Sequence, residues 1–416
     1  AAERSAARGL KTLLLEKNRR PGVKILMSGG TRCNLTQATD SRGIVAAYGP
    51  SGKFLHSALA ALSPQDLVAL VEAEGVPTKV EDTGKIFPVS NRATDILQAF
   101  LNRLHRTPCE LALDEPLLEF ERLATTSENG AATVPSGRAP VSVPRFRLTT
   151  PNRALLADNL IITTGGQSYP GSGTTGDAYP WAAKLGHTII PPRPALVPIT
   201  TFAPWVRDLS GLTIPDVSLQ LVEPFLATAK PKILDTRRGS LLFTHFGLSG
   251  PVVLDISRHV TAHAKPQSLI LSCDFLPNEK RSALDQQLKS QAAATGKKQF
   301  LSLVPETIPR RLAELILQQI NLSPDKKAAE LSTAGRSALV GALKELPIPV
   351  AGTRGFAKAE VTAGGVALAE IDSRTMQSKL VPGLYFAGEV LDLDGPIGGY
   401  NFQAAFSTGW LAGMNV

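Results

Sequence analysis

The most constraining feature of the sequence is a helix signal followed at once by a short apolar strand that ends in an acid. The alanine-rich segment AAERSAARG stops at Gly9, and KTLLLEK is an apolar run of strand length that leads to Glu16. Glycine commonly follows the end of a helix. In a dinucleotide-binding βαβ unit, the second strand ends in an acid that accepts hydrogen bonds from the adenosine ribose. The opening therefore predicts a Rossmann-type α/β domain, although taken alone it could be any helix–strand pair.

The position of Glu16 determines where the phosphate-binding glycines of such a unit would fall. They normally lie about 20 residues before the acid, and only fifteen residues precede Glu16. We therefore expect the first strand and its glycine loop to precede Ala1, in an N-terminally shortened sequence that binds a dinucleotide weakly or not at all. GSGTTG at 171–176 has the spacing of the fingerprint but does not directly follow a strand. It predicts a loop over a cofactor or substrate.

The stretch PGVKILMSGGTRCNLT at 21–36 contains the groups that a buried anionic ligand would need. Gly29 and Gly30 would let the backbone approach a cofactor closely. Lys24 and Arg32 supply positive charge. Hydrogen-bond partners come from Ser28, Thr31, Asn34 and Thr36. By spacing alone, this stretch could equally be an ordinary surface loop.

Composition indicates a folded protein of two or three domains in a reducing compartment. The 416 residues are 43% hydrophobic and 19% charged, which does not suit wholesale disorder. The three cysteines form no disulfide framework, and neither they nor the histidines have the spacing of a metal site. No apolar run reaches the roughly 18 residues of a membrane span. These features predict a cytoplasmic protein that binds no metal and no membrane.

The net charge of +8 raises the question of a nucleic-acid partner. The basic residues form scattered pairs, such as Arg237-Arg238 and Lys326-Lys327, without an aromatic-studded basic motif. Such pairs usually lie on a solvated surface, so a small-molecule substrate is the first expectation. A nucleic-acid-linked flavoprotein, akin to flavin-dependent tRNA modifiers, is the alternative. The sequence does not indicate an oligomeric state.

Five motifs in order along the chain resemble those of the HI0933-like flavoproteins, the family of the BaiN-type and YhiN-type oxidoreductases. The motifs are KILMSGGTRCNLT at 24–36, GKIFPVSNRATDIL at 84–97, ITTGGQSYPGSGTTGDAY at 162–179, LLFTHFGLSGP at 241–251 and GLYFAGEVLDLDGPIGGYNFQAAFSTGWLAG at 383–413. Lys85 stands where the family motif has arginine. The resemblance implies an oxidoreductase that binds FAD.

The resemblance also implies the fold, which is a glutathione-reductase-like Rossmann FAD domain with a β-barrel-like insertion and a helical insert. We expect the FAD domain at 1–193 and 356–416, the barrel-like insertion at 194–276, the helical insert at 277–335 and the return through the barrel at 336–355. The pattern of strand-like and helical runs along the chain agrees with this fold in outline. Strand-like runs at 117–126, 145–150 and 159–166 suit an antiparallel meander, with a hairpin extension at 127–144. The proline-rich stretch 191–199 predicts an exit linker.

The resemblance places several glycine-rich turns around the flavin. Glu389, after the strand-like LYFA, would accept hydrogen bonds from the ribityl or pyrophosphate region. The turn before the last helix would direct amides at the pyrimidine end of the isoalloxazine, because helix N-termini carry partial positive charge. The expected cofactor-binding residues are Glu16, Lys17, Lys24, Ser28, Gly29, Gly30, Arg32, Cys33, Asn34, Thr164, Gly165, Gly166, Gly176, Asp177, Gly388, Glu389, Gly398, Gly399, Tyr400 and Asn401.

Three residues are candidates for catalysis. Arg32 could favour the anionic reduced flavin as a fixed cation. Cys33 could react as a thiolate, although free cysteines are most often buried packing residues. His245 could be a general acid on the substrate side, or it could bond a loop carbonyl. We expect hydride to pass from NAD(P)H through the flavin to an unsaturated or carbonyl compound. An inactive, shortened remnant is the third hypothesis.

Overall fold

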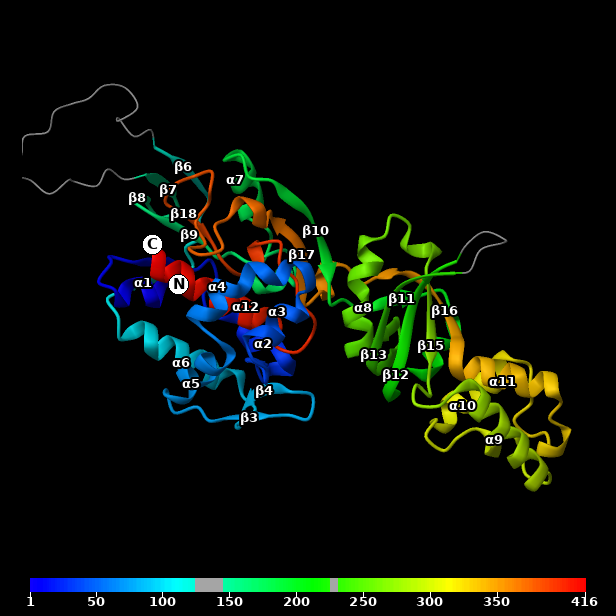
Figure 1. The fold of residues 1–416 in the computed structure, drawn as a ribbon. Coiled ribbons are helices and arrows are strands. Elements are labelled where there is room, and N and C mark those ends of the chain that lie inside the picture. Colours follow the sequence, from blue (N-terminus) through cyan, green and yellow to red (C-terminus); the bar gives the residue numbers. More distant parts are fainter. Residues whose placement is uncertain (124–144, 225–230) are drawn as a thin grey trace, which may run out of the picture. The chain divides into compact units, whose positions relative to one another are not determined.

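The computed structural model describes residues 1–123, 145–224 and 231–416, and it divides the chain into two compact units (Figure 1). Unit 1 comprises Ala1–Pro192 and Val361–Val416, and unit 2 comprises Arg193–Glu360. Unit 2 is therefore an insertion in unit 1. The predicted hairpin extension at 127–144 lies outside the described residues.

Two parallel ladders in unit 1 contain the strands of the Rossmann-type domain. Strand β1 (Leu13–Leu15) pairs with β5 (Glu110–Ala112), and β9 (Leu160–Ile162) pairs with β18 (Leu384–Phe386). The helix expected before β1 is α1 (Ala2–Ala7), and Gly9 takes the left-handed conformation just after it. The second ladder joins strands from the two ends of the chain, so unit 1 requires both of its segments.

Antiparallel strands complete the sheets of unit 1. The runs predicted at 117–126 and 145–150 contain β6 and β7 of an antiparallel sheet with the order β6–β7–β8, but the run predicted at 159–166 contains β9 of the parallel ladder instead of the third strand. A second antiparallel sheet has the order β2–β4–β3. Strand β10 begins two residues before the predicted exit linker at 191–199, includes the first five residues of that segment and pairs with β17. The bounds are β2 (Thr36–Gln37), β3 (Thr78–Val80), β4 (Lys85–Pro88), β6 (Glu119–Arg122), β7 (Phe146–Thr149), β8 (Ala154–Ala157), β10 (Ile189–Ala195) and β17 (Val361–Val366).

Several helices of unit 1 pack against α12 (Tyr400–Asn415), the red helix of Figure 1. Its inner positions are small or neutral residues, including Ala404, Thr408 and Gly409, which let neighbouring helices approach closely. Helix α1 lies beside it, and Arg8 donates to the Gly413 carbonyl at 3.1 Å. The other helices are α2 (Val23–Thr31), α3 (Ser41–Ala47), α4 (His56–Ala61), α5 (Pro64–Glu72), α6 (Ala93–His105) and α7 (Ala178–Lys184).

The stretch Gly49–Glu72 is long and apolar enough to cross a membrane by length and composition alone, which is weak evidence for a span. In the structure it is not one continuous helix. Helix α4 ends at Ala61, Leu62 is extended, and Ser63 begins α5 with a capping box. Leu55, Leu59 and Leu67 are buried in the core of unit 1, as expected for a packed helical segment of a folded domain.

Unit 2 contains a closed six-stranded barrel with the strand order β11–β14–β13–β12–β15–β16. Residues that alternate along β12, such as Val217, Leu219 and Leu221, are fully buried, which is the pattern of a strand with one face toward a core. The barrel strands are β11 (Ile199–Thr201), β12 (Thr213–Glu223), β13 (Lys232–Thr244), β14 (Gly247–Ser249), β15 (Ile270–Asp274) and β16 (Leu346–Thr353).

The helices of unit 2 differ from the sequence expectation in two places. Helix α8 (Pro251–Ala262) interrupts the stretch expected to contain strands, because Val252, Val253, Ile256 and Val260 repeat at helical spacing and pack against the barrel. The expected helical insert does contain α9 (Arg281–Ala294) and α10 (Arg310–Gln319). Its third helix, α11 (Thr333–Glu345), continues ten residues beyond 335, so only β16 returns through the barrel.

Candidate functional site

Helix α2 is broken where the sequence predicts the closest approach to a cofactor. Ser28 is extended, and Gly29 and Gly30 are left-handed with φ of 56° and 65°. A Cβ on Gly30 would meet nothing within 4 Å, whereas a Cβ on Gly29 would lie 2.9 Å from the amide nitrogen of Asn34. The segment expected as a loop is therefore a kinked helix, whose exposed backbone at Gly29 and Gly30 can receive a ligand.

Glu389 joins three separate segments of unit 1. Its Oε1 accepts a hydrogen bond from Ser168 Oγ at 2.6 Å and one from the Thr362 amide at 2.8 Å. Lys24 Nζ lies 3.6 Å from its Oε2 and donates to Ser168 Oγ at 2.9 Å. We call Lys24, Ser168, Thr362 and Glu389 the Glu389 network. The structure thus brings together Lys24 and Glu389, two of the predicted site residues.

Thr362 holds the loop after β9 in place. Its Oγ1 accepts from the amides of Gln167 at 2.8 Å and Ser168 at 3.0 Å. A Cβ on Gly166 would lie 2.3 Å from the same oxygen, so only glycine fits there. Gly165, at φ 74°, also takes the left-handed conformation, and Thr164 beside it is exposed. The predicted residues 164–166 therefore form a tight, anchored turn next to the Glu389 network.

The start of α12 is held against β2. Gly399 is left-handed with φ 92°, and a Cβ there would lie 2.6 Å from the Thr36 carbonyl oxygen. In the orientation that satisfies both its partners, the Asn34 amide accepts from the Gly399 N–H at 2.9 Å and donates to the Thr36 carbonyl at 3.0 Å. The buried Thr36 hydroxyl donates to Gln403 at 2.6 Å. These contacts orient the first-turn amides of α12.

The glycine turn before α12 is stabilised by Asn401. Its side chain accepts from the Gly395 amide at 2.8 Å and donates to the Gly395 carbonyl at 3.0 Å. Tyr48 Oη donates to the Tyr400 carbonyl at 3.1 Å. Gly398, at φ 129°, and Gly388, at φ 78°, supply the remaining left-handed turns. The structure gives Asn401 a positioning role in this turn.

A third group lies at the end of β1. Lys17 Nζ donates to Asp177 Oδ2 at 2.6 Å and to Thr175 Oγ1 at 2.7 Å. Partial burial would raise the pKa of Asp177, but the Lys17 and Thr175 bonds outweigh it and hold that pKa below its usual value. Glu16 Oε1 accepts from the Asn18 amide at 2.8 Å. The residue after the terminal acid of β1 thus connects this strand end to the loop around Gly176.

Arg32 is paired with an acid. Its guanidinium lies 2.6 Å from Glu81 and 4.0 Å from the centre of the Phe87 ring. Its Nε also donates to the Gly29 carbonyl at 3.4 Å. Because Glu81 compensates most of the positive charge of Arg32, the effect of Arg32 on a neighbouring flavin would be smaller than that of an isolated cation.

Cys33 does not have the surroundings of a reactive thiolate. It is fully buried, and burial raises the pKa of its thiol to about 12, although a hydrogen bond with Ser28 opposes that shift. A thiolate nucleophile needs an exposed, electropositive site. The structure therefore speaks against catalysis by Cys33. Its φ of 59° instead suggests that it fixes the chain after the broken helix.

His245 lies in the turn between β13 and β14 of unit 2. It is exposed, and its ring packs edge-on against Phe246 at 5.0 Å between ring centres. Arg354 lies over the other ring of this pair, 4.5 Å from the centre of Phe246. Exposure leaves His245 accessible to a substrate, so its catalytic role remains a prediction.

Three functional residues escaped the sequence analysis. Ser168 lies in a recognised motif but is one hydroxyl among many, and Gln403 is one of several polar residues on helix α12. Thr362 lies in VTAGGV, the fully buried strand β17. In the sequence, the signal for Thr362 was a polar residue close to a pair of glycines in an otherwise apolar run. Gly364 and Gly365 are both left-handed, and Cβ atoms there would lie 2.5–2.6 Å from neighbouring carbonyl oxygens.

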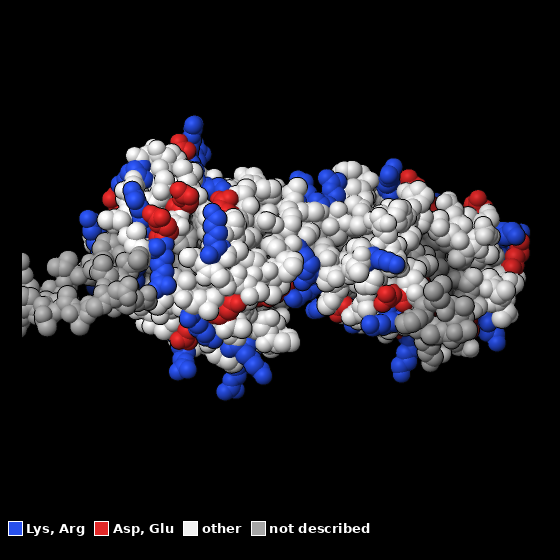
Figure 2. Space-filling model, turned by 90° about the horizontal axis from the view of Figure 1, so that it is seen from above, with Lys and Arg blue, Asp and Glu red and all other residues white. Residues whose placement is uncertain are grey.

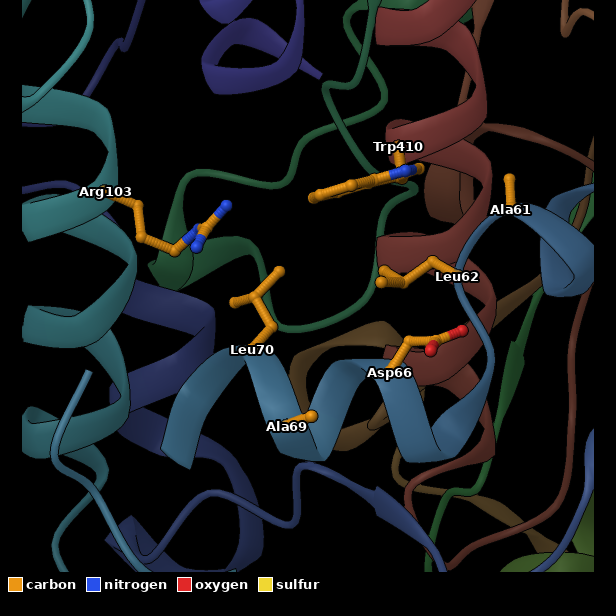
Figure 3. Close-up of a pocket in the computed structure, with 7 residues that line it drawn as sticks. All are labelled: Ala61, Leu62, Asp66, Ala69, Leu70, Arg103 and Trp410. Atoms are coloured by element: carbon orange, nitrogen blue, oxygen red, sulfur yellow. The ribbon is translucent and has the colours of Figure 1, made fainter. Parts of the chain in front are cut away.

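A hollow of about 420 Å³ lies elsewhere on unit 1, among α5, α6 and α12 (Figure 3). Trp410, Leu70 and Arg103 point toward it from these three helices. It contains none of the predicted site residues. At its rim, Arg103 forms an ion pair with Glu3 at 2.9 Å.

The donors and acceptors of unit 1 described above suit FAD. Lys17 and Lys24 could pair with phosphate oxygens, and Glu16 and Glu389 could accept hydrogen bonds from sugar and ribityl hydroxyls. The space beside Gly30 admits a ligand next to the backbone. This mixture of cations and hydroxyl acceptors fits a dinucleotide better than it fits a simple anion.

Comparison with known proteins identifies the family. Residues 1–415 match the model of the HI0933-like protein Rossmann domain. The ribosomal RNA dihydrouridine synthase of Escherichia coli (strain K12) is 32% identical, covering 98% of this chain and 92% of that protein. The protein of the same name from Haemophilus influenzae is 30% identical, with coverage of 100% and 94%. The 3-dehydro-bile acid delta(4,6)-reductase of Clostridium scindens is 29% identical, with coverage of 97% and 92%. The chain therefore belongs to the HI0933-like family of FAD-dependent Rossmann oxidoreductases.

Proposed function

We propose that the protein reduces the C5=C6 bond of a uridine in RNA, with a reduced nicotinamide nucleotide as the source of electrons. The observation that carries the proposal is the similarity of almost the whole chain to two ribosomal RNA dihydrouridine synthases. The sequence pattern favoured a small-molecule substrate first, and the relatives shift the preference to the alternative, an RNA-linked flavoprotein.

The names of the relatives point to one type of reaction. Dihydrouridine is uridine whose C5=C6 bond, conjugated to the C4 carbonyl, has gained two hydrogens. A delta(4,6) bile acid with a 3-keto group also has double bonds conjugated to a carbonyl. In both cases hydride adds to the carbon remote from the carbonyl and a proton adds to the carbon next to it. A site for one substrate therefore needs the same chemical groups as a site for the other.

The residues of unit 1 would bind and orient the cofactor. FAD, when bound, supplies the hydride. Glu16 would accept hydrogen bonds from the adenosine ribose, and Lys24 would pair with the pyrophosphate while Glu389 fixes its direction. The first-turn amides of α12 would lie toward the pyrimidine edge, where they favour negative charge. His245 is the proposed donor of the proton to the substrate.

Charge is compatible with an RNA substrate. The chain has 44 lysines and arginines against 36 acids. Figure 2 shows basic side chains spread over one face of the molecule, with acidic side chains among them. Such a distribution suits binding to phosphates at several separate points more than a single basic groove.

The test is formation of dihydrouridine in vitro. Purified protein, FAD, protein-free ribosomal RNA and either NADH or NADPH are incubated, and the nucleosides are analysed by mass spectrometry for a gain of two mass units. A parallel reaction contains a 3-keto-delta(4,6) steroid. We expect dihydrouridine with wild type and with Glu306→Gln, an exposed acid of unit 2, and loss of product with Glu389→Gln.

The steroid substrate distinguishes the two candidate functions, reduction of RNA and reduction of a small conjugated ketone. A small conjugated ketone is the second candidate because one relative is named as a bile acid reductase. Reduction of the steroid without reduction of RNA would overturn the RNA proposal in its favour. Failure of both, by a protein that binds FAD, would refute reduction of conjugated double bonds altogether.

A further inference from the structure

Two lysine pairs of unit 2 that are separate in the sequence lie next to each other in the structure. Lys297 and Lys298 come after α9, and Lys326 and Lys327 come after α10. An antiparallel bridge between Gln299 and Lys327 joins the two segments. We call these four lysines the lysine cluster. All of them lie within unit 2, so their arrangement does not depend on unit 1.

Two backbone hydrogen bonds hold the segments of the lysine cluster together. The Ala328 amide donates to the Lys298 carbonyl at 2.7 Å, and the Phe300 amide donates to the Lys326 carbonyl at 2.8 Å. Phe300 and Ala328 are buried, whereas all four lysines are exposed. Paired backbones lie about 5 Å apart. The four exposed side chains therefore start from one small area of the surface.

The region around the lysine cluster has an excess of positive charge. Residues 277–345 contain eleven lysines and arginines and seven acids, so this stretch carries half of the chain's net charge of +8. Three of the seven acids form ion pairs with arginines of the same region, and the pairs are Asp285–Arg336, Glu314–Arg310 and Glu345–Arg281. These acids are therefore engaged elsewhere.

The acids nearest in sequence to the lysine cluster bond to other groups. Asp325 Oδ1 accepts from the side-chain amide of Gln299 at 3.3 Å, and Glu330 Oε1 accepts from the backbone amide of Lys327 at 3.1 Å. In the described part of the chain, no carboxylate forms an ion pair with any lysine of the cluster. Even with Asp325 and Glu330 counted, four cations exceed two anions.

This arrangement favours an anionic ligand. Like charges on paired segments repel one another and destabilise the fold slightly. An anion bound among the four ammonium groups would replace that repulsion with attraction. A ligand with several negative charges would satisfy more of the lysines than a single small anion could.

We propose that the lysine cluster binds the phosphate backbone of RNA. This inference rests on the proposed function, and it assigns one RNA contact to unit 2. Lysine ammonium groups are compact point charges that pair with phosphates and release counterions. Phe300 is buried, so its ring cannot stack on a base as aromatic residues of single-strand-binding proteins do. The contact should therefore depend on charge and not on the RNA sequence.

The experiment measures binding of a fluorescent 40-nucleotide single-stranded RNA to the full chain across a series of KCl concentrations. The double variants Lys297→Gln/Lys298→Gln and Lys326→Gln/Lys327→Gln each remove two charges from the cluster. Loss of two phosphate contacts should reduce the slope of log K against log salt by about 1.4 and weaken binding roughly tenfold at about 0.15 M KCl. A second RNA of different sequence should give the same losses.

The variant Lys265→Gln/Lys280→Gln is the matched control. Both lysines are exposed in unit 2, lie outside the lysine cluster and form no ion pair with a described residue. The control removes the same charge, so it distinguishes a local contact from a general effect of net charge, and it should leave the slope nearly unchanged. Thermal unfolding is the second measurement. The cluster variants should unfold at the temperature of wild type or slightly higher, because repulsion is relieved.

The outcomes separate this inference from the proposed function. If wild type forms dihydrouridine and binds RNA but both cluster variants bind like the control, the lysine cluster is not a contact surface and the proposed function is unaffected. If wild type neither binds RNA nor forms dihydrouridine, the proposed function fails as well. If vesicles containing phosphatidylserine bind with the expected dependence on the lysines and RNA does not, the cluster recognises anionic lipid and the RNA assignment is overturned.

Discussion

Replacing Thr362 by valine would remove one oxygen from the Glu389 network and little else. Valine has nearly the shape of threonine, so no cavity forms. The lost Oγ1 accepts the amides of Gln167 and Ser168 at 2.8 and 3.0 Å. Thr362 is fully buried, so water cannot replace the oxygen without a local opening. The backbone amide of residue 362 still donates to Glu389.

The expected effect follows from two donors left without an acceptor. A buried donor that loses its partner costs about 1–3 kcal/mol. Ser168 is fully buried and Gln167 only half-buried, so about 2–4 kcal/mol is expected for the two together. Because about 1 kcal/mol moves the midpoint of a domain of this size by roughly 2–4 °C, unit 1 should unfold roughly 4–16 °C lower.

The assay must follow unit 1 alone. Trp205 lies in unit 2, and Trp181 and Trp410 lie in unit 1. In a Trp205→Phe background, tryptophan fluorescence reports on unit 1 during thermal unfolding. Titration with FAD gives a second measurement, and we expect its dissociation constant to rise about tenfold, equivalent to 1.4 kcal/mol, when the turn at 165–168 loosens.

Thr362→Ser is the matched control, because it keeps the acceptor and loses only a methyl group. Serine should lower the stability by about 0.8 kcal/mol, the value of one buried methylene, and leave FAD binding nearly unchanged. If valine and serine destabilise unit 1 equally, the hydroxyl is not the important group. If valine leaves both stability and FAD binding unchanged, the reasoning about the Glu389 network is refuted.

Three other predictions follow from the site and its surroundings. Glu16→Gln should weaken FAD binding by about 1–3 kcal/mol, measured by flavin fluorescence; an unchanged constant would make Glu16 a surface acid. Arg32→Ala should lower the reduction potential of the flavin slightly and slow flavin reduction by the nicotinamide donor, whereas His245→Ala should slow only flavin reoxidation by the substrate. Spectroelectrochemistry measures the potential, and stopped-flow half-reactions measure the two rates. If the effects of the two variants are reversed, the roles of Arg32 and His245 must be exchanged. Burial lowers the pKa of His187, so the unfolded histidine takes up a proton first as pH falls below about 6.5. Stability of unit 1 should therefore decrease between about pH 7 and 5, and His187→Gln should flatten that decrease while exposed His56→Gln should not.

Local features of the fold were predictable from the sequence where one pattern dominated. The helix–strand opening, the strand before Gly388 and the last helix all have strong local signals, and all are present as α1, β1, β18 and α12. The exit linker predicted at 191–199 does contain the passage from unit 1 to unit 2, at Pro192 and Arg193, but its first residues belong to strand β10, because prolines are tolerated in a strand of a two-stranded ladder. Helix α8 was missed because its apolar spacing follows a run of strand-like residues.

The candidate site was predictable in its members but not in its connections. Lys24 and Glu389 were both expected, yet no sequence pattern indicates that Ser168 links them. Arg32 was expected as a fixed cation beside the flavin, and only the structure places Glu81 against it. Contacts between residues that lie hundreds of positions apart depend on the tertiary fold, and the spacing of residues along the chain does not reveal these contacts.

The insertion of unit 2 within unit 1 has a consequence for synthesis on the ribosome. Thr36 and Gln403 share a buried hydrogen bond although they are 367 positions apart, and β9 lacks its partner β18 until residue 386 has been made. A continuous unit 2 can fold as soon as it emerges, since domains fold as units during translation. Unit 1 must keep its first 192 residues soluble throughout that interval. The cofactor site therefore forms late, and a chain cut short after unit 2 would lack Glu389 and the start of α12 and be unable to retain FAD.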